Sequence, residues 1–308
     1  MNGQIPSVSI VIPAHNSEKW IASVLESCSA QTLPPHEVIV IDDGSTDGTG
    51  DVCRSVAPAA HYRKIEQGGV SRARNIGARE ASGEWLLFLD SDDILLPHAI
   101  SRLHAAAFSG SAGVAYGMVL ERAAPDALPR LNGFGYCAGS PPHSALNGLY
   151  RGVIATPGSA LVRKSLHDRA GGFVSGFEPL EDRDYWLKCG LLERVAYCDT
   201  VVLDKTWRPA SHGSQHAKRI YRSQLAQRAL REWCSARGVA ADILPADPRF
   251  VKTALDEAVH WGCREIIPRL RQEARRFGIR HPQSFFAGLS GCPPAPEWLD
   301  EAPRVLHE

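Results

Sequence analysis

Three aspartates follow a run of apolar residues in this sequence. Residues 85–89 read Trp-Leu-Leu-Phe-Leu, and Asp90-Ser91-Asp92-Asp93 comes directly after them. Two carboxylates that flank one residue at a strand end, here Asp90 and Asp92, can project together and hold a hard divalent cation through oxygen ligands. Mg²⁺ or Mn²⁺ bound in this way keeps coordination positions for phosphate oxygens. The alternative is that Asp92 or Asp93 caps a helix that starts here.

A second acidic segment follows the apolar residues 38–41. Its Gly, Ser and Asp content, from Asp42 to Gly48, is typical of a turn. A calcium loop is excluded because its twelfth position would be Arg54, where a bidentate glutamate is needed. As a functional loop, the segment offers Asp43 as an acceptor for the ring N–H of a base.

Two further candidates lie later in the chain. Asp182 belongs to an acidic start of an apolar helix, residues 181–187, where carboxylates are favoured by the helix dipole. The functional alternative is that one of these carboxylates acts as a general base near a crevice. His212 lies in a polar loop, where histidines are mostly solvated and metal ligation is the less common case.

The first hundred residues alternate short apolar runs with helical patterns, which is typical of a βαβ sheet. Strands are predicted at 8–12, 38–41, 62–65 and 85–89, helices at about 17–31 and 71–81, and loops at 42–50 and, beyond this region, at 123–142. In an open parallel sheet the carboxyl ends of the strands line one crevice, where ligands bind. Chain order therefore brings five polar residues towards one place: His15, Asp42, Asp43, Asp90 and Asp92.

Composition and motifs exclude several classes of protein. Lys and Arg number 34, as do Asp and Glu, and 44% of the 308 residues are hydrophobic, so we expect a globular protein that does not bind nucleic acid. The eight cysteines form no C-x-x-C pair, which argues against a zinc site, and we expect most of them to be buried thiols in a reducing compartment. The sequence has no P-loop and no G-x-S-x-G motif. Residues 1–7 do not resemble a signal peptide, and no apolar stretch of about 18 residues exists, so we expect a cytoplasmic protein.

The composition changes near residue 216. Residues 217–280 hold 14 Lys and Arg against 7 Asp and Glu, on segments with helical patterning. Such helices could dock peripherally on the anionic inner face of a membrane, where lipid-linked acceptors would be. Solvated faces that pack on the rest of the chain, or a homodimer interface, explain the same residues.

Seven segments in order resemble the family 2 inverting glycosyltransferases, which use nucleotide-sugar donors. The resemblance covers about residues 7–215. The matching segments are 8–16, 40–47, 68–77, 83–93, 157–159, 171–173 and 181–187.

This resemblance implies an α/β fold of the GT-A type, a Rossmann-like open mixed sheet flanked by helices, with a nucleotide-sugar-binding half at 1–110 and an acceptor-binding and catalytic half at 111–216. The composition adds a basic helical C-terminal extension at 217–308, which matches no motif of the family.

The resemblance also assigns donor-binding roles. Pro13, Ala14 and His15 would line the pocket of the nucleotide base, and Asp43 would accept a hydrogen bond from a uracil-type ring. His15 stands where relatives commonly carry tyrosine, so stacking on the base would differ. Arg74 would face the phosphates.

The catalytic roles follow in the same way. Asp90 and Asp92 would form a D-x-D pair that holds Mn²⁺ or Mg²⁺ against the diphosphate, with Asp92 as the direct ligand and His212 as a further one. Asp182 would be the catalytic base. A base on one face of the sugar and a metal on the other predict inversion of configuration.

We therefore expect a metal-dependent transferase that moves a sugar from a nucleotide diphosphate donor, a UDP-sugar, to a hydroxyl acceptor. By resemblance, that acceptor is a glycan or lipid-linked precursor of surface polysaccharide, lipopolysaccharide or another glycoconjugate. One alternative is a sugar-1-phosphate nucleotidyltransferase, which would need a basic phosphate-binding loop where residues 13–16 stand. The other is a sugar-nucleotide-binding scaffold without catalysis, which should lack the D-x-D pair or the base.

Overall fold

The computed structural model describes residues 6–122, 128–132, 156–178, 180–206, 229–239 and residue 272. The chain falls into two compact units, which are described separately below. The first unit is residues 1–175 with 185–208, and the second is 176–184 with 209–308.

A mixed sheet is the framework of the first unit. Its described strands are β1 (Val8–Ala14), β2 (Glu37–Asp43), β3 (His61–Ile65), β4 (Trp85–Phe88), β5 (Ile94–Leu95), β6 (Val114–Arg122), β7 (Arg130–Asn132), β8 (Ala160–Arg163) and β9 (Val195–Thr206). They follow the order β3-β2-β1-β4-β8-β6-β9-β5, with β7 paired to β6. The strands β1 to β4 are parallel, β8 is antiparallel to β4 and β6, and β6 and β9 are parallel.

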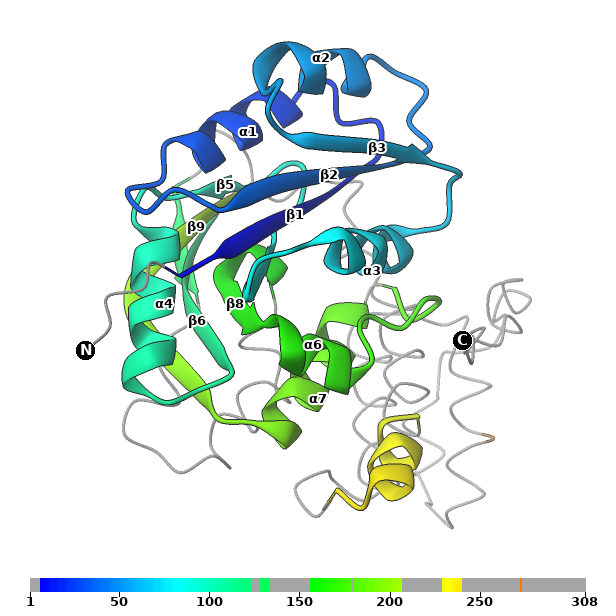
Figure 1. Cartoon of the computed structure of the whole chain (residues 1–308), viewed down its shortest axis with the longest axis vertical. Coiled ribbons are helices and arrows are strands. Elements are labelled where there is room, and N and C mark those ends of the chain that lie inside the picture. The colour runs from blue at the N-terminus through cyan, green and yellow to red at the C-terminus, as the bar shows by residue number, and fades with distance from the viewer. Residues whose placement is uncertain are drawn as a thin grey trace, which may run out of the picture. The chain divides into compact units, whose positions relative to one another are not determined.

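Helices flank the sheet on both faces (Figure 1). They are α1 (Ile21–Ser29), α2 (Thr49–Val56), α3 (Val70–Glu80), α4 (Ala99–Ser109), α6 (Lys164–Ala170) and α7 (Glu181–Leu192), together with a 3₁₀ turn, Pro157–Ser159. In the second unit the described residues include a helical stretch at 229–237 and the first residues of α7. Within the described residues, no helix has both the length and the apolarity needed to span a membrane.

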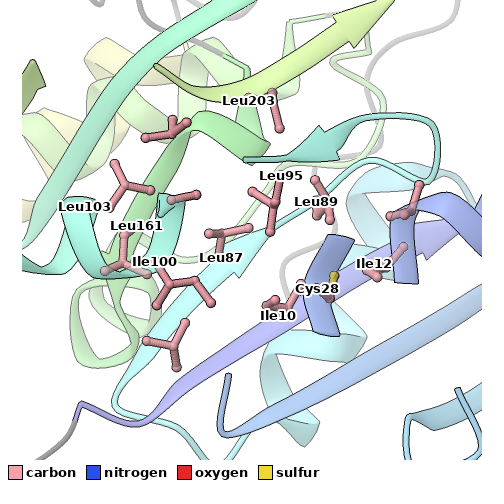
Figure 2. Packing of buried hydrophobic residues seen from close by; sticks show 14 of the residues in the cluster. Ile10, Ile12, Cys28, Leu87, Leu89, Leu95, Ile100, Leu103, Leu161 and Leu203 are labelled. Carbon is pink, nitrogen blue, oxygen red and sulfur yellow. The ribbon is translucent and has the colours of Figure 1, made fainter. Parts of the chain in front are cut away.

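The core on one face of the sheet is aliphatic (Figure 2). Ile10 and Ile12 of β1 and Leu87 of β4 point to the same face, where they pack with Cys28 of α1 and Leu103 of α4. Alternate residues of a strand point to opposite faces, so Phe88 of β4 faces the other layer. There it packs in an aromatic cluster with His167, Phe173 and Tyr185.

The helix α3 lies unusually close to the sheet. A Cβ atom built on Gly77 would collide with Cγ1 of Val11 and come within 3.3 Å of Ile41. Because glycine has no side chain, the α3 backbone can rest directly on β1 and β2. This contact fixes the distance of α3 from the strands, and with it the position of the side chains on the preceding turn, which carries Arg74 and Asn75.

The structure confirms the four predicted N-terminal strands and the two predicted helices, although the first helix begins at Ile21 rather than near residue 17. The prediction that residues 42–50 form a plain loop is wrong at its end, because α2 begins at Thr49. The predicted loop at 123–142 contains the short strand β7. The helix α6 and the long strand β9 were not predicted.

The described cysteines are free and buried, which confirms the prediction of buried thiols for Cys28, Cys53, Cys189, Cys198 and Cys234. Burial raises the pKa of the Cys28 thiol to about 12. These residues therefore act as small apolar side chains of the core.

Candidate active site

The loops that carry the candidate residues lie at one edge of the sheet. The strand β1 pairs in parallel with both β2 and β4, so the chain leaves all three strands at the same edge. His15 follows β1, Asp43 ends β2 and Asp90 comes just after β4. The premise that these strands are parallel neighbours is thus confirmed.

The loop after β1 is tied to its neighbours by its own polar groups. His15 Nδ1 lies 2.8 Å from the carbonyl oxygen of Asp43, and because a carbonyl only accepts, Nδ1 carries the proton. Nε2 is left to accept from the side-chain amides of Asn16 and Gln67, at 3.2 and 3.4 Å. Of the three residues predicted to line a base pocket, Pro13 and Ala14 are buried and His15 is exposed.

Asp43 accepts two backbone hydrogen bonds. Its Oδ1 accepts from the N–H of Gly68 at 2.7 Å and its Oδ2 from that of Gly69 at 2.8 Å, and the side chain is buried. Gly69 adopts φ +92°, which only glycine adopts readily. Asp43 therefore fixes the start of α3 as well as the end of β2, and each oxygen keeps one lone pair for a further donor.

The loops after β1 and β4 are also joined. The Ser17 hydroxyl lies 2.6 Å from that of Ser91, the residue between the two aspartates of the D-x-D pair. Asp90 and Asp92 are both half-buried. This hydrogen bond holds the middle of the acidic triplet against the first loop.

Arg74 forms a largely buried ion pair with Asp90. Its Nη2 donates to Asp90 Oδ1 at 2.6 Å, and its side chain is 3% exposed against 23% for Asp90. The other side of the guanidinium faces the Phe173 ring, with Cζ 5.1 Å from the ring centroid. Arg74 was predicted to face phosphates; in this structure it pairs with Asp90, the first aspartate of the pair.

Lys205, near the end of β9, approaches the same carboxylates. Its Nζ donates to Asp93 Oδ2 at 3.1 Å and lies 3.7 Å from Asp90 Oδ2. Lys205 was not among the predicted site residues. The apolar run 201–203 could have predicted the strand, but no pattern indicated what the lysine contacts.

These contacts set the ionisation of the group. Burial opposes a charge on Asp90, but Arg74 and then Lys205 outweigh it, so the pKa of Asp90 lies below its ordinary value. Asp93 is fully buried, and this burial raises its pKa to about 7 in spite of the attraction of Lys205. Burial would lower the pKa of Lys205, but Asp93 and then Asp90 raise it above its ordinary value. Lys205 is therefore a charged ammonium at neutral pH.

The donor set suits a hard cation only in part. Asp90 and Asp92 supply carboxylate oxygens of the type that Mg²⁺ and Mn²⁺ prefer. In the part of the chain that the structure describes, no three His, Cys, Asp or Glu side chains come together as a metal cluster. The two aspartates therefore fit a cation that completes its coordination with other oxygens, such as those of a diphosphate. His212, the further predicted ligand, lies outside the described residues.

Asp182 lies in the first turn of α7, in the second unit. It is half-buried, whereas the neighbouring acids Glu181 and Asp184 are buried, and its Oδ1 accepts the N–H of Arg183 at 2.6 Å. Carboxylates are stabilised at a helix start by the helix dipole. Asp182 is thus the most exposed of the three acids in this turn.

A clamp from α3 holds the segment that follows α6. The side-chain amide of Asn75 donates to the carbonyl of Phe173 at 2.8 Å and accepts its N–H at 2.9 Å. Gly172, at φ +68°, lies against the same amide oxygen. Adjacent residues of one helix, Arg74 and Asn75, therefore bind the D-x-D pair and the Gly-Gly-Phe segment.

Comparison with known proteins identifies the family. The sequence model of Glycosyl transferase family 2 matches residues 9–171, more than half of the chain. The chain belongs to this family. Its matched region contains β2 to β4, all of β1 except Val8, and both aspartates of the D-x-D pair.

Relatives match this family 2 chain over part of their length. Glycosyltransferase GlyA of Streptococcus pneumoniae serotype 4 is 32% identical over 113 residues, which are 36% of this chain and 16% of the relative. An uncharacterized glycosyltransferase of Rickettsia felis is 26% identical over 235 residues, 71% of this chain and 36% of the relative. The alignments thus span well under two thirds of these relatives.

Solved structures agree on the fold. TarS 1–349 of S. aureus, in complex with UDP-GlcNAc, superposes with a TM-score of 0.59 at 19% identity, over 87% of this chain and 88% of that one. The mannosyltransferase PcManGT of Pyrobaculum calidifontis, in complex with GDP-Man and Mn²⁺, gives a TM-score of 0.56 at 18% identity, over 92% and 83%. The predicted fold, a GT-A type mixed sheet flanked by helices, is confirmed.

Proposed function

We propose that this chain is a metal-dependent inverting glycosyltransferase that moves a sugar from a nucleotide diphosphate donor to a hydroxyl acceptor. The observation that carries the proposal is the position of Asp90 and Asp92 directly after β4, at the edge where the loops of β1 and β2 also emerge. Ligands of open α/β sheets bind at the carboxyl ends of the strands. Family membership points to the same reaction class.

The D-x-D pair is proposed to hold Mn²⁺ or Mg²⁺, with Asp92 as the direct ligand. When bound, the cation would stabilise the negative charge that develops on the nucleoside diphosphate leaving group. Asp90 stays ionised because Arg74 and Lys205 lie beside it. His212 is a further proposed ligand, and replacing it with alanine should weaken metal binding if it has this role.

The donor is proposed to be a UDP-sugar. Asp43 has a lone pair on each oxygen beyond its bonds to Gly68 and Gly69, and could accept the ring N–H of uracil. Pro13, Ala14 and the exposed His15 would form the neighbouring wall. The complex of TarS with UDP-GlcNAc supports a UDP donor, whereas the GDP-Man complex of PcManGT supports a purine nucleotide.

Asp182 is proposed as the catalytic base. An acceptor hydroxyl has to lose its proton while it attacks the anomeric carbon, and a carboxylate within hydrogen-bonding reach contributes roughly 10²- to 10⁴-fold to the rate. Asp182, although half-buried, is the most exposed acid of its turn, and its carboxylate is oriented by the Arg183 N–H. A base that acts opposite the leaving group gives inversion.

The acceptor is proposed to be a glycan or lipid-linked precursor of a surface polysaccharide or related glycoconjugate. The segments 1–110 and 111–216 would bind donor and acceptor, and the basic segment 217–308 would contact an anionic membrane or a second copy of the chain. Vesicle co-sedimentation at low salt tests the membrane contact.

Calorimetric titration of UDP, GDP and TDP, with Mn²⁺ and with EDTA, tests the donor site. We expect metal-dependent binding of UDP that Asp92→Ala abolishes and that Asp51→Ala, at an exposed acid of α2, leaves intact. A preference for GDP or TDP would refute the UDP assignment but keep the transferase. No binding of any nucleotide would favour a scaffold without catalysis.

Asp182→Asn tests the base separately. We expect turnover to fall by roughly 10²- to 10⁴-fold while the affinity for the donor nucleotide stays unchanged. Turnover near that of the wild type, with donor binding intact, would remove Asp182 from the mechanism.

A further inference from the structure

The acidic cluster formed by the D-x-D pair and Asp93 lies next to two positively charged side chains. Asp90, Asp92 and Asp93 formally contribute three negative charges, and Arg74 and Lys205 return two positive ones. These five described side chains together are therefore formally −1. An uncomplexed divalent cation gains little from a cluster whose charge is largely compensated.

The two cations are held differently. Arg74 is buried, donates through Nη2 to Asp90 and is stacked on Phe173, so it is part of the framework. Lys205 comes from another strand and is 19% exposed, with a flexible stem and a compact charge. Its Nζ lies 3.7 Å from Asp90 Oδ2, the oxygen that does not pair with Arg74.

Asp93 keeps the lysine in this place. Its Oδ2 accepts from Lys205 Nζ at 3.1 Å, and its Oδ1 is buried with no hydrogen-bond partner among the described residues. The side chain is fully buried, and among the described residues Lys205 is the cation that pairs with it. Asp93 thus anchors an ammonium group beside the D-x-D pair.

We propose that Lys205 is a resident counter-cation of the D-x-D site, which competes with divalent metal at Asp90 and makes tight metal binding depend on the diphosphate of the donor. This inference rests on the proposed function. A diphosphate adds negative charge and oxygen ligands, and the site then favours a divalent cation in addition to Lys205. Lys205 acts as a positioning residue, because it acts on the metal through the Asp90 carboxylate, beside which it lies together with Arg74.

Two variants that each break the Lys205–Asp93 ion pair test the proposal, because they should change the affinity for Mn²⁺ in opposite directions. Lys205→Met removes the competing charge, so Mn²⁺ alone should bind about tenfold or more tightly than in the wild type, as expected for loss of one charge a few ångströms from a divalent ion. Asp93→Asn leaves Lys205 next to the Asp90 carboxylate and should weaken Mn²⁺ binding. The readout is the Mn²⁺ dissociation constant at about pH 8, from the electron paramagnetic resonance of free Mn²⁺, without nucleotide.

Loss of a structural contact alone would move both variants in the same direction. If Lys205→Met folds poorly because Asp93 is left buried without its cation, the double variant Lys205→Met/Asp93→Asn removes that charge too. It should bind Mn²⁺ more tightly than Asp93→Asn. Arg122→Met is the matched control, since Arg122 pairs with Asp204, the residue before Lys205, and should leave Mn²⁺ binding unchanged.

The outcomes separate this inference from the proposed function. If the wild type binds Mn²⁺ with UDP but Lys205→Met and the double variant gain no affinity for Mn²⁺ alone, the inference is wrong and the metal site stands. If the variants show the predicted order, the inference holds. If no protein binds Mn²⁺ even with a nucleoside diphosphate, both the inference and the metal dependence are refuted.

Discussion

Replacing Asn75 with alanine should destabilise the protein by breaking the clamp between α3 and Phe173. The amide makes two hydrogen bonds to that residue, at 2.8 and 2.9 Å, each worth about 0.5–1.5 kcal/mol. Phe173 is buried, so its N–H and carbonyl would also lose solvation without a new partner. Together these effects predict a loss of about 2–4 kcal/mol.

Urea unfolding followed by tryptophan fluorescence, without metal or nucleotide, measures this loss. Asn75→Asp is a sharper variant, because it keeps the acceptor for the Phe173 N–H but places an oxygen opposite the Phe173 carbonyl. It should be at least as destabilising as alanine. Ser101→Ala, at a position on α4 whose hydroxyl hydrogen bond is exposed, should change the unfolding free energy by about 0.5 kcal/mol or less. A loss below about 1 kcal/mol in both Asn75 variants would refute the clamp.

Three other predictions concern buried polar groups. Arg74→Met should lower the free energy of unfolding by about 2–3 kcal/mol at neutral pH, less than the loss of a fully buried pair because Asp90 is partly exposed. Since the pKa of Asp90 is lowered in the folded protein, the difference in stability between wild type and variant should shrink as the pH falls below about 4. Unfolding curves at several pH values test this. Tyr62→Phe removes the hydroxyl that donates to buried Asp42 at 2.5 Å, and should cost about 2 kcal/mol in the same assay. Cys28, whose pKa is raised to about 12 by burial, should resist iodoacetamide at neutral pH and react only after unfolding, as mass spectrometry of the labelled chain can test.

The parts of the fold that follow from local pattern could be predicted from the sequence. The apolar runs before residues 13, 42 and 90 correspond to β1, β2 and β4, because strands buried on both faces read as continuous apolar segments. Chain order then places the polar loops at one edge. The D-x-D pair and Asp43 were found in this way.

The contacts of Lys205 and of Asn75 depend on pairings between residues that are distant in the sequence. Lys205 contacts Asp93 across 112 positions of sequence, through the antiparallel pairing of β5 with β9. No periodicity encodes such a pairing. The clamp of Asn75 on Phe173 spans 98 positions and likewise appears only in three dimensions.

The helix α2 was missed for a different reason. Its start, Gly48-Thr49-Gly50, has the composition of a turn, and glycine is unfavourable inside helices. Gly50 nevertheless lies in the helix, and the position requires glycine because a side chain there would collide with the Tyr62 hydroxyl. Packing against β3 thus outweighs local propensity.

The pairing of β5 with β9 has a consequence for how the protein is made. The ribosome delivers residues 90–95 about a hundred residues before β9, which supplies the described strand partner of β5 and the ammonium that compensates buried Asp93. Until β9 emerges, burying Asp93 would leave its charge uncompensated, at a cost of several kcal/mol. We expect residues 90–95 to stay solvent-exposed in the nascent chain, and Asp93 to become buried only after β9 has been synthesised.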